Sequence, residues 1–214
     1  MIKVIFENND IIVIDKPAGM PTHPSRLHQG DSLADAVSAY LDISGHDFIF
    51  RSVNRLDRDT SGLVLISKSK ESSAHYNRLM RERRIRREYE ALAEDDGSMP
   101  DSGTIDAPIV RANAADPHDI SRKVDYINGE RAVTHFTVTG RSPGKVRVHF
   151  ALETGRTHQI RVHMSHIGHP IIGDRLYNPH AAPDELAQLR AVRIIIHDDA
   201  GDSVFSVDGF PLPE

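Results

Sequence analysis

The sequence predicts an α+β fold built on a mixed, mainly antiparallel central sheet with flanking helices and loops. Strand-like segments outnumber helix-like segments over the 214 residues, and several follow one another directly. Two strands with alternating apolar residues, over 132–138 and 146–152, are joined by a short glycine-containing loop typical of a hairpin. The helices fall between strands without the strict alternation that a doubly wound parallel sheet requires.

The first half of the chain alternates apolar runs with turn residues, and each run predicts one element. Proline and glycine interrupt the segment after residue 15 and predict an irregular loop. Asp31 and Ser32 precede apolar residues at helical spacing and are candidate N-caps. The expected order is strands over 1–6 and 11–15, a helix over 33–41, a strand over 63–66, a helix over 70–82 and a strand over 88–93.

The second half combines polar stretches with the hairpin and a further helix. Apolar residues mark one face of a helix that begins near Thr157, its candidate cap, and that ends at Gly168. We expect polar loops over 94–103 and 112–130, a short helix over 184–190, and strands over 192–197 and 203–207.

Composition excludes several classes of protein. A net charge of −5 argues against a nucleic-acid coat over the whole surface. The absence of cysteine excludes disulfides, thiolate catalysis and cysteine zinc sites. The N-terminus is too short and too soon charged for a signal peptide, and no apolar run approaches the length of a membrane span. We therefore expect a soluble, cytoplasmic monomer with no membrane association and a single domain over 1–214.

The segment 54–63 is the most informative part of the chain. Asp57 lies between Arg55 and Arg58, just before a turn that opens into an apolar strand. A loop residue anchored on a buried strand is held rigidly yet faces solvent, which suits a catalytic group. The flanking arginines should keep Asp57 ionised. The alternative is a surface turn with incidental ion pairs.

A run of six arginines and one glutamate covers 78–87 and indicates binding to a polyanion. The alternative is a solvated helix end, where cations are favourable in any case. Tyr89 follows the run, and an aromatic beside cations can stack on a base. It can equally be a cross-strand residue that packs on the sheet.

A second polar cluster lies at the start of the helix near Thr157. Donor groups predominate there, which suits a phosphate or the orientation of a carboxylate such as Asp57. The alternative is the polar face of an amphipathic helix. The cluster consists of Arg156, His158, Gln159 and Arg161.

Metal and cofactor signatures are missing from the sequence. The four histidines between 158 and 169 are spaced so that no more than two share a helix face, and there is no His-Glu-x-x-His motif. The chain has no glycine-rich phosphate loop, dinucleotide fingerprint or nucleophile elbow. We therefore expect neither a metal nor an organic cofactor.

With these segments in view, the chain resembles the RluA-type pseudouridine synthases over nearly its whole length. Asn54 stands where many relatives have histidine, and Asp198 and Asp199 stand where they more often have a small apolar residue. The segments that carry the resemblance are 15–20 with His23-Pro24, 54–63, 86–92, 154–163 and 168–174.

The resemblance implies the pseudouridine synthase catalytic fold, without the small N-terminal RNA-binding module that many relatives carry. It implies isomerisation of specific uridines in a stem-loop of ribosomal or transfer RNA, with no metal or cofactor. Asp57 would be the essential carboxylate, and the sequence leaves open whether it attacks the sugar or abstracts a ribose proton. Arg161 would orient Asp57, and Tyr89 would stack under the uracil and act in the final proton removal.

The resemblance implies that Arg55 would fill the space that the flipped nucleotide leaves. From the arginine run itself, we expect backbone contacts from Arg83, Arg84, Arg86 and Arg87. Two alternatives remain at this stage. One is an RNA-binding domain without catalysis. The other is a nucleoside or glycoside hydrolase that uses Asp57 with Asp59, although nearby arginines would lower the pKa of both carboxyls and weaken either as an acid.

Overall fold

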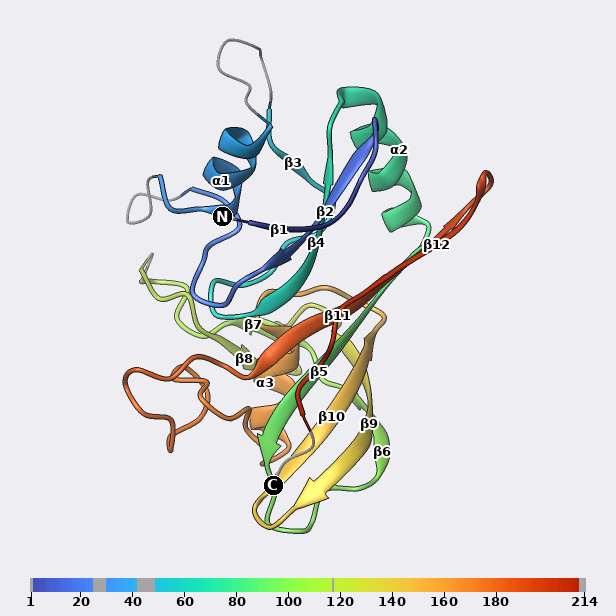
Figure 1. Ribbon diagram of the computed structural model, residues 1–214. Coiled ribbons are helices and arrows are strands. Elements are labelled where there is room, and N and C mark those ends of the chain that lie inside the picture. Colours follow the sequence, from blue (N-terminus) through green and yellow to red (C-terminus); the bar gives the residue numbers. More distant parts are fainter. Residues whose placement is uncertain (1, 25–29, 42–48, 117, 212–214) are drawn as a thin grey trace. The chain divides into compact units, whose positions relative to one another are not determined.

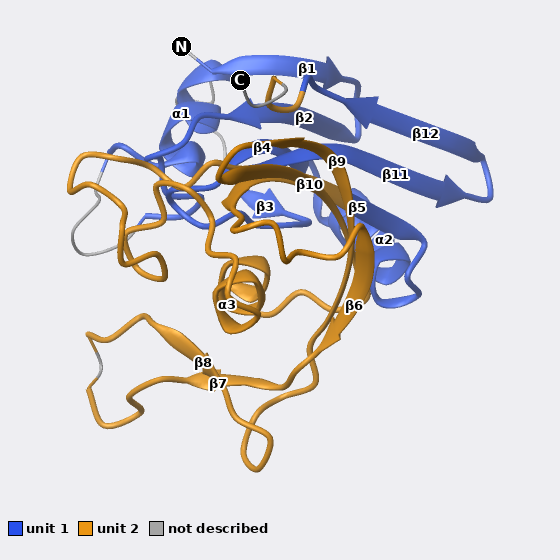
Figure 2. Cartoon of the chain, turned by 90° about the horizontal axis from the view of Figure 1, so that it is seen from below, with its two compact units in different colours: residues 1–87, 190–208 blue, residues 88–189, 209–214 orange. Residues whose placement is uncertain are grey.

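The computed structural model describes residues 2–24, 30–41, 49–116 and 118–211 (Figure 1). Three helices and twelve strands make up the described elements, and strands pair mainly antiparallel, which confirms the predicted α+β class. The chain divides into two compact units (Figure 2). Unit 1 comprises residues 1–87 and 190–208, and unit 2 comprises residues 88–189 and 209–214.

Unit 1 contains a sheet in the order β1-β2-β4-β11, with β3 paired to β4 and β12 paired to β11. All of these pairs are antiparallel except β4 with β11. The strands are β1 (Lys3–Glu7), β2 (Ile11–Lys16), β3 (Arg51–Ser52), β4 (Ser61–Ser67), β11 (Leu189–Asp198) and β12 (Gly201–Ser206). The helices are α1 (Leu33–Tyr40) and α2 (Lys70–Arg81).

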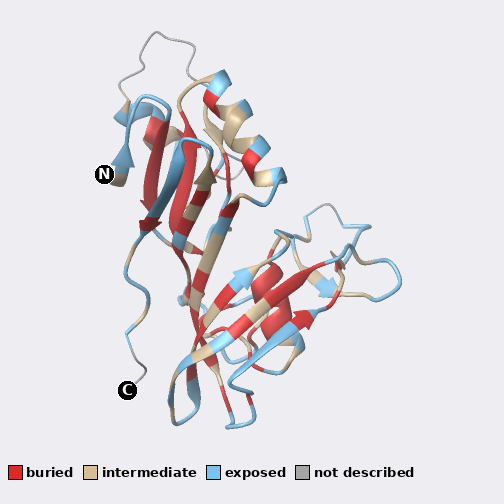
Figure 3. Ribbon diagram, turned by 90° about the vertical axis from the view of Figure 1, so that its right-hand side faces the viewer, coloured by how far each residue is buried: buried red, intermediate tan, exposed pale blue. Residues whose placement is uncertain are grey.

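The core of unit 1 lies on β2 and β4, where nearly every residue is buried (Figure 3). A strand that is covered on both faces needs a continuous apolar run, and residues 11–14 and 63–66 supply two such runs. Helix α1 begins at Ser32 with a capping box to Asp35, as the sequence predicts. The buried cluster comprises Ile11, Val13, Val53, Leu63, Leu65, Leu79, Ile85, Ile194, Ile196 and Phe205.

Unit 2 contains antiparallel strands in the order β5-β10-β9-β6 and a separate β7–β8 pair. Helix α3 is tied to this unit by buried His163, whose Nε2 lies 2.9 Å from the Ala107 carbonyl and whose Nδ1 lies 2.9 Å from Thr134 Oγ1. The elements are β5 (Ile85–Glu94, which starts in unit 1), β6 (Ser102–Asp106), β7 (Ile109–Arg111), β8 (Arg122–Val124), β9 (Val133–Ser142), β10 (Lys145–Leu152) and α3 (Gln159–His166).

Two sequence predictions are wrong in this unit. The stretch 112–130 is not loop throughout, because β8 pairs with β7 inside it. The predicted helix over 184–190 is absent, because turns lead directly into β11. The Gln188 carbonyl accepts from the Leu92 N–H, and the Gln188 N–H donates to the Ile172 carbonyl, so this extended pairing uses the groups that a helix would need. Among the described residues, no helix has the length and apolar character of a membrane span.

The contact between β4 and β11 generates a stability prediction. Gly62 has φ +108, and a Cβ atom there would lie 2.6 Å from the backbone nitrogen of Ala191. Gly62→Ala should lower the free energy of unfolding by about 3 to 5 kcal/mol, because steric overlap adds to the cost of a positive φ. Gly97→Ala is the matched control, since Gly97 has φ +95 with open space around it.

Urea unfolding of the two variants tests this contact. Gly97→Ala carries only the conformational cost, about 1 to 2 kcal/mol. Equal losses in both variants would contradict a tight approach of β11 to Gly62.

Candidate active site

Asp57 lies half-buried in the loop of unit 1 that leads from β3 into β4. Arg55 is exposed. Arg58 donates from Nε and Nη2 to the two oxygens of Asp59, at 2.8 and 3.2 Å. The arginine that follows Asp57 in the sequence therefore pairs with the next carboxylate along the chain.

The backbone on both sides of Asp57 is fixed by buried polar side chains. Thr22 Oγ1 donates to the Leu56 carbonyl at 2.8 Å and accepts from the Leu56 N–H at 3.2 Å. Asn54, which departs from the family pattern, pairs with the backbone of Leu63 and Leu65 on β4 at 3.1 and 2.8 Å. Leu56, directly before Asp57, and the strand that follows the loop are thus both tied to buried side chains, which limits the freedom of the Asp57 backbone.

Lys16 is the cation that the structure associates with this loop, and sequence reasoning missed its role. Its side chain is fully buried at the end of β2, and Nζ donates to the carbonyls of Pro17, Met20 and Arg58 at 2.9, 2.7 and 3.1 Å. Burial lowers its pKa to about 8, against the attraction of the Asp57 and Asp59 charges. The available sequence signal was a lysine that follows the apolar run 11–14 after a single residue, Asp15.

The base of the same loop is joined to β11 by a charge pair within unit 1. Arg190 Nη2 donates to both oxygens of Asp15 at 2.9 and 2.7 Å, and its Nη1 lies 3.3 Å from Ser61 Oγ. Asp15 precedes Lys16, and Ser61 is the first residue of β4. Arg190 therefore links β11 to the end of β2 and to the start of β4, the strand that follows the Asp57 loop.

Tyr89 lies on β5 within unit 2 and is buried. Its register partner across the antiparallel pair is Phe150 on β10. The cross-strand packing that was the alternative interpretation of Tyr89 is thus present, and it leaves the catalytic interpretation as a proposal.

Arg161 lies on α3 and is buried in a network of its own unit. Nε and Nη2 donate to the two oxygens of Asp174 at 2.7 and 2.6 Å. The guanidinium carbon lies 5.1 Å from the centre of the Tyr177 ring. Tyr177 Oη is in turn 2.7 Å from His158 Nδ1. Sequence reasoning missed the roles of Asp174 and Tyr177, although Asp174 stands in the segment 168–174, which is one of those that carry the family resemblance.

The start of α3 differs from the prediction. The N-cap is His158, in the left-handed conformation at φ 57, and not Thr157, and no side chain caps the helix. The Gln159 side chain instead holds the turn that precedes the helix. Its Oε1 accepts from Thr154 Oγ1 and from the Arg156 N–H, at 2.8 and 2.9 Å. Its Nε2 donates to β9, at Val133 and Thr134.

The expected polar face of α3 is consequently buried at His158, Gln159 and Arg161. Arg156 remains exposed and forms an ion pair with Glu130.

The arginine run does not lie on one helix end. Arg84 donates to the His197 carbonyl and to Asp199, each at 2.7 Å, so its charge is engaged within unit 1. Arg83 has φ 58 in the turn after α2, while Arg86 and Arg87 belong to β5. Of the four predicted phosphate contacts, Arg83 and Arg86 are exposed, and Arg84 and Arg87 are half-buried.

Among the described residues, one group of side chains, Asp95, Asp96 and His169, lies close enough for a metal ion. The Asp95 carboxylate already accepts from Arg141 Nη1 and from the backbone N–H groups of Gly97 and Met99. These contacts give the Asp95 carboxylate a structural role, which is to hold the turn that follows β5.

The three predicted catalytic residues are divided between the units. Asp57 belongs to unit 1, and Tyr89 and Arg161 belong to unit 2. Each is held by contacts within its own unit, and their combination in one site belongs to the proposed function.

The buried Lys16 generates a prediction of pH dependence. Its folded pKa of about 8 lies below the ordinary value of 10.5, so the unfolded chain binds more protons between these two pH values. The free energy of unfolding should therefore rise with pH across this window, by about 3 kcal/mol at most.

Unfolding of wild type and Lys16→Met from pH 7 to 11 isolates this contribution. The wild type should gain stability relative to the variant above pH 8 and level off above about pH 10.5. Parallel curves for the two proteins would contradict the depressed pKa.

Comparison with known proteins identifies the family of this chain. The model of the RNA pseudouridylate synthase family matches residues 10–166. The RNA pseudouridine synthase YhcT of Bacillus subtilis strain 168 is 40% identical over 178 residues, which cover 81% of this chain and 57% of the relative. Ribosomal large subunit pseudouridine synthase D of Pseudomonas aeruginosa is 39% identical over 178 residues, which cover 82% and 53%.

The chain thus spans little more than half the length of these relatives. A solved structure, human RNA pseudouridylate synthase domain containing 1, matches with a TM-score of 0.79 at 23% identity, covering 97% of this chain and 83% of that one, and shows the shared fold. These matches confirm the resemblance to RluA-type enzymes, and the chain belongs to the RNA pseudouridylate synthase family.

Proposed function

We propose that this chain is a pseudouridine synthase that converts specific uridines in structured RNA into their carbon-linked isomer. The observation that carries the proposal is the Asp57 loop, in which a half-buried carboxylate lies between backbone segments clamped by buried side chains, with a buried lysine charge nearby. The backbone on either side of Asp57 is thereby held in place before substrate arrives, which a reacting carboxylate requires for precise positioning.

The reaction is redox-neutral and is balanced without an outside reagent. The bond from C1′ of the ribose to N1 of uracil breaks, the base turns, a bond from C1′ to C5 forms, and C5 loses its proton. Asp57 assists the first step by attack on the sugar or by removal of a ribose proton. Either role requires a carboxylate at a fixed position, and the clamped backbone around Asp57 supplies that position.

Arg161 is proposed to orient Asp57. Asp174 accepts from Nε and Nη2, so the edge of the guanidinium that bears Nη1 is not occupied by Asp174. A guanidinium held on one edge by a buried carboxylate points its other donors in a fixed direction. Tyr89 is proposed to stack under the uracil, and its hydroxyl to act in the removal of the C5 proton.

The target uridine must leave its stack to reach these groups, which costs a few kcal/mol. Exposed Arg55 is suited to fill the vacated space, and exposed Arg83 and Arg86 are suited to backbone phosphates. Relatives named for the large ribosomal subunit favour ribosomal over transfer RNA as the substrate. We propose that the chain acts as a cytoplasmic monomer, with its two units forming one catalytic domain.

A hydrolase that uses Asp57 with Asp59 is the weaker candidate. A paired-carboxylate hydrolase needs one carboxyl that retains a proton. Asp59 instead accepts two hydrogen bonds from the Arg58 guanidinium, which favours its ionised form.

Tritium release from RNA labelled at C5 of uridine tests the function. Wild-type protein without added metal or cofactor should release tritium, and Asp57→Asn should lose at least about a thousandfold in rate, because it keeps the shape and removes the charge. Asp59→Asn is the matched control and should stay within about tenfold of wild type, since Asp59 is assigned no contact with the reacting uridine. Retention of a tenth of the activity by Asp57→Asn would refute the assignment.

The clamp on Leu56 gives a second prediction. Thr22→Val keeps the shape and removes both hydrogen bonds, so kcat should fall roughly ten- to a hundredfold through misplacement of Asp57, with RNA affinity nearly unchanged. Thr22→Ser retains the hydroxyl and should stay close to wild type. Single-turnover rates and separate binding isotherms distinguish the two effects, and equal rates for the valine and serine variants would count against the clamp.

A further inference from the structure

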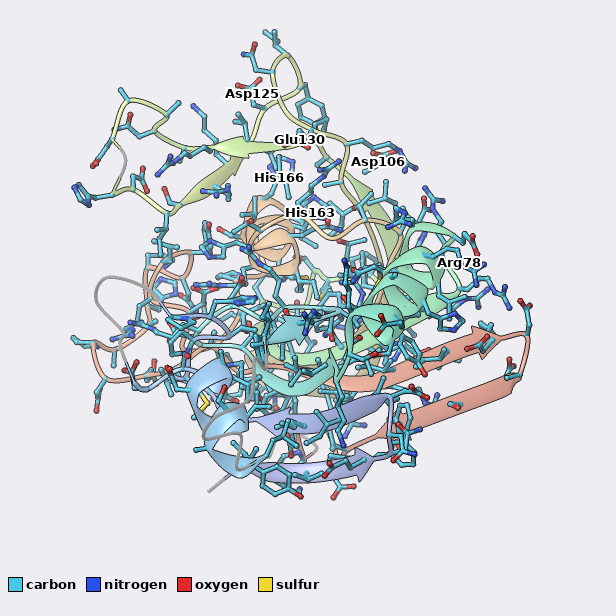
Figure 4. The ribbon with its side chains drawn as sticks, turned by 90° about the horizontal axis from the view of Figure 1, so that it is seen from above. Arg78, Asp106, Asp125, Glu130, His163 and His166 are labelled. Carbon is cyan, nitrogen blue, oxygen red and sulfur yellow. The ribbon has the colours of Figure 1, made fainter. Side chains whose placement is uncertain are left out.

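Unit 2 contains a groove of about 650 Å³ that the proposed mechanism does not use. It lies between the turn that follows β8 and the exposed side of α3. The residues that matter here are Arg122, Lys123, Tyr126, Ile127, His166 and Tyr177. In Figure 4, His166 lies on α3 and Asp125 on the turn beyond β8.

The rim of the groove exposes an unusual amount of apolar surface. The Tyr126 side chain is 68% exposed and Ile127 is 91% exposed. The turn that carries them is fixed, because Asp125 Oδ1 accepts from the N–H groups of Ile127 and Asn128 at 2.9 and 3.0 Å. Tyr126 Oη lies 3.5 Å from His166 Nε2. The groove therefore presents an accessible aromatic ring on a preformed turn, at little entropic cost on binding.

The charges at the rim favour an anionic ligand. Lys123 is exposed, and Arg122 uses Nη1 on the carbonyls of Ile120 and Ser121, which fixes its guanidinium. Asp125 is turned onto backbone N–H groups, chiefly that of Asn128, which lowers its pKa. Asp125 also attracts the Lys123 charge, and Asp119 attracts that of Arg122. Both carboxylates already accept backbone N–H groups, while exposed Lys123 and the fixed Arg122 guanidinium remain at the rim.

The groove adjoins the proposed catalytic machinery through one side chain. Tyr177 lines the groove, and its hydroxyl accepts from the Arg122 N–H at 2.8 Å. The Arg161 guanidinium lies over the ring of the same tyrosine. A strand in the groove would thus run one side chain away from Arg161, within unit 2.

We infer that this groove binds single-stranded nucleotides that flank the target uridine. One base stacks on Tyr126, and Lys123 and Arg122 contact phosphates. Stacking on an exposed aromatic beside cations is the general mode of single-strand recognition and tolerates any base. The inference rests on the proposed function for the identity of the RNA, but the groove chemistry is testable without turnover.

Equilibrium binding of fluorescein-labelled decauridylate, and of an in vitro transcribed large-subunit ribosomal RNA, provides the test. Tyr126→Ala should weaken binding about tenfold, the usual effect of removing a stacking aromatic. Tyr126→Phe retains the ring and should bind like wild type. Lys123→Gln should flatten the salt dependence by about 0.7 through loss of one phosphate contact.

Two matched controls lie outside the groove. Tyr40→Ala removes an exposed tyrosine of α1, and Lys145→Gln removes an exposed lysine at the start of β10. Both should bind like wild type. Melting temperatures check that each variant is folded, and photo-crosslinking with 4-thiouridine should label the peptide that contains Tyr126.

Unchanged affinity in Tyr126→Ala together with an unchanged salt slope in Lys123→Gln would overturn the inference. The inference would also be overturned if, with RNA binding unchanged, the variants altered self-association or binding to another protein. The groove would then serve a protein partner. Tritium release by the wild type separates the two proposals. If the wild type releases tritium but the Tyr126 and Lys123 variants bind RNA like wild type, only the groove proposal is refuted. Groove-dependent binding without release from any RNA refutes the synthase and supports the groove.

Discussion

The buried ammonium of Lys16 is the interaction on which the Asp57 loop depends. An isolated charge inside a protein is strongly unfavourable unless donors and acceptors are matched. Lys16 meets that requirement with three carbonyls, of which one, at Arg58, lies 42 residues away along the chain. Any displacement of the loop would deprive the ammonium of an acceptor and of the nearby Asp57 and Asp59 charges. The cost of burying this lysine is therefore also what resists movement of Asp57.

In unit 2, too, a buried charge with matched partners fixes a functional group, but here the functional group is the cation, Arg161, and its buried partner is a carboxylate, Asp174. Arg161 and Asp174 are both buried and meet through two short hydrogen bonds. Removing one partner from such a pair typically costs about 3 to 5 kcal/mol, because the other charge stays buried. The pair contributes little net stability compared with apolar packing, but it fixes the direction of a guanidinium. In each unit, a buried charge that has few other hydrogen-bonding partners available thus fixes the position of a proposed functional group.

The sequence was sufficient for features whose cause is local. Alternating apolar residues predicted β9 and β10, and the Ser32 cap predicted the start of α1, because period and capping act within a few residues. The α3 cap was wrong, because Gln159 satisfies this segment through contacts with a strand that lies more than twenty residues earlier. The helix over 184–190 failed for the same reason, since its backbone pairs with distant residues.

Within the proposed site, residue type and motif predicted the groups proposed to act on the uridine, but not the residues that hold those groups in place. Thr22, Lys16 and Asp174 act through partners 34, 42 and 13 positions away, and no short pattern carries such pairs. Net charge was similarly uninformative about RNA. The value of −5 includes carboxylates already engaged, such as Asp199 with Arg84.

Screening at physiological salt acts over about 8 Å, so a phosphate responds to the cations beside it and hardly to the distant acidic surface. For binding to RNA, the decisive quantity is therefore which exposed cations lie beside the bound strand, with Arg55, Arg83, Arg86 and Lys123 as the proposed ones, rather than the charge of the whole chain.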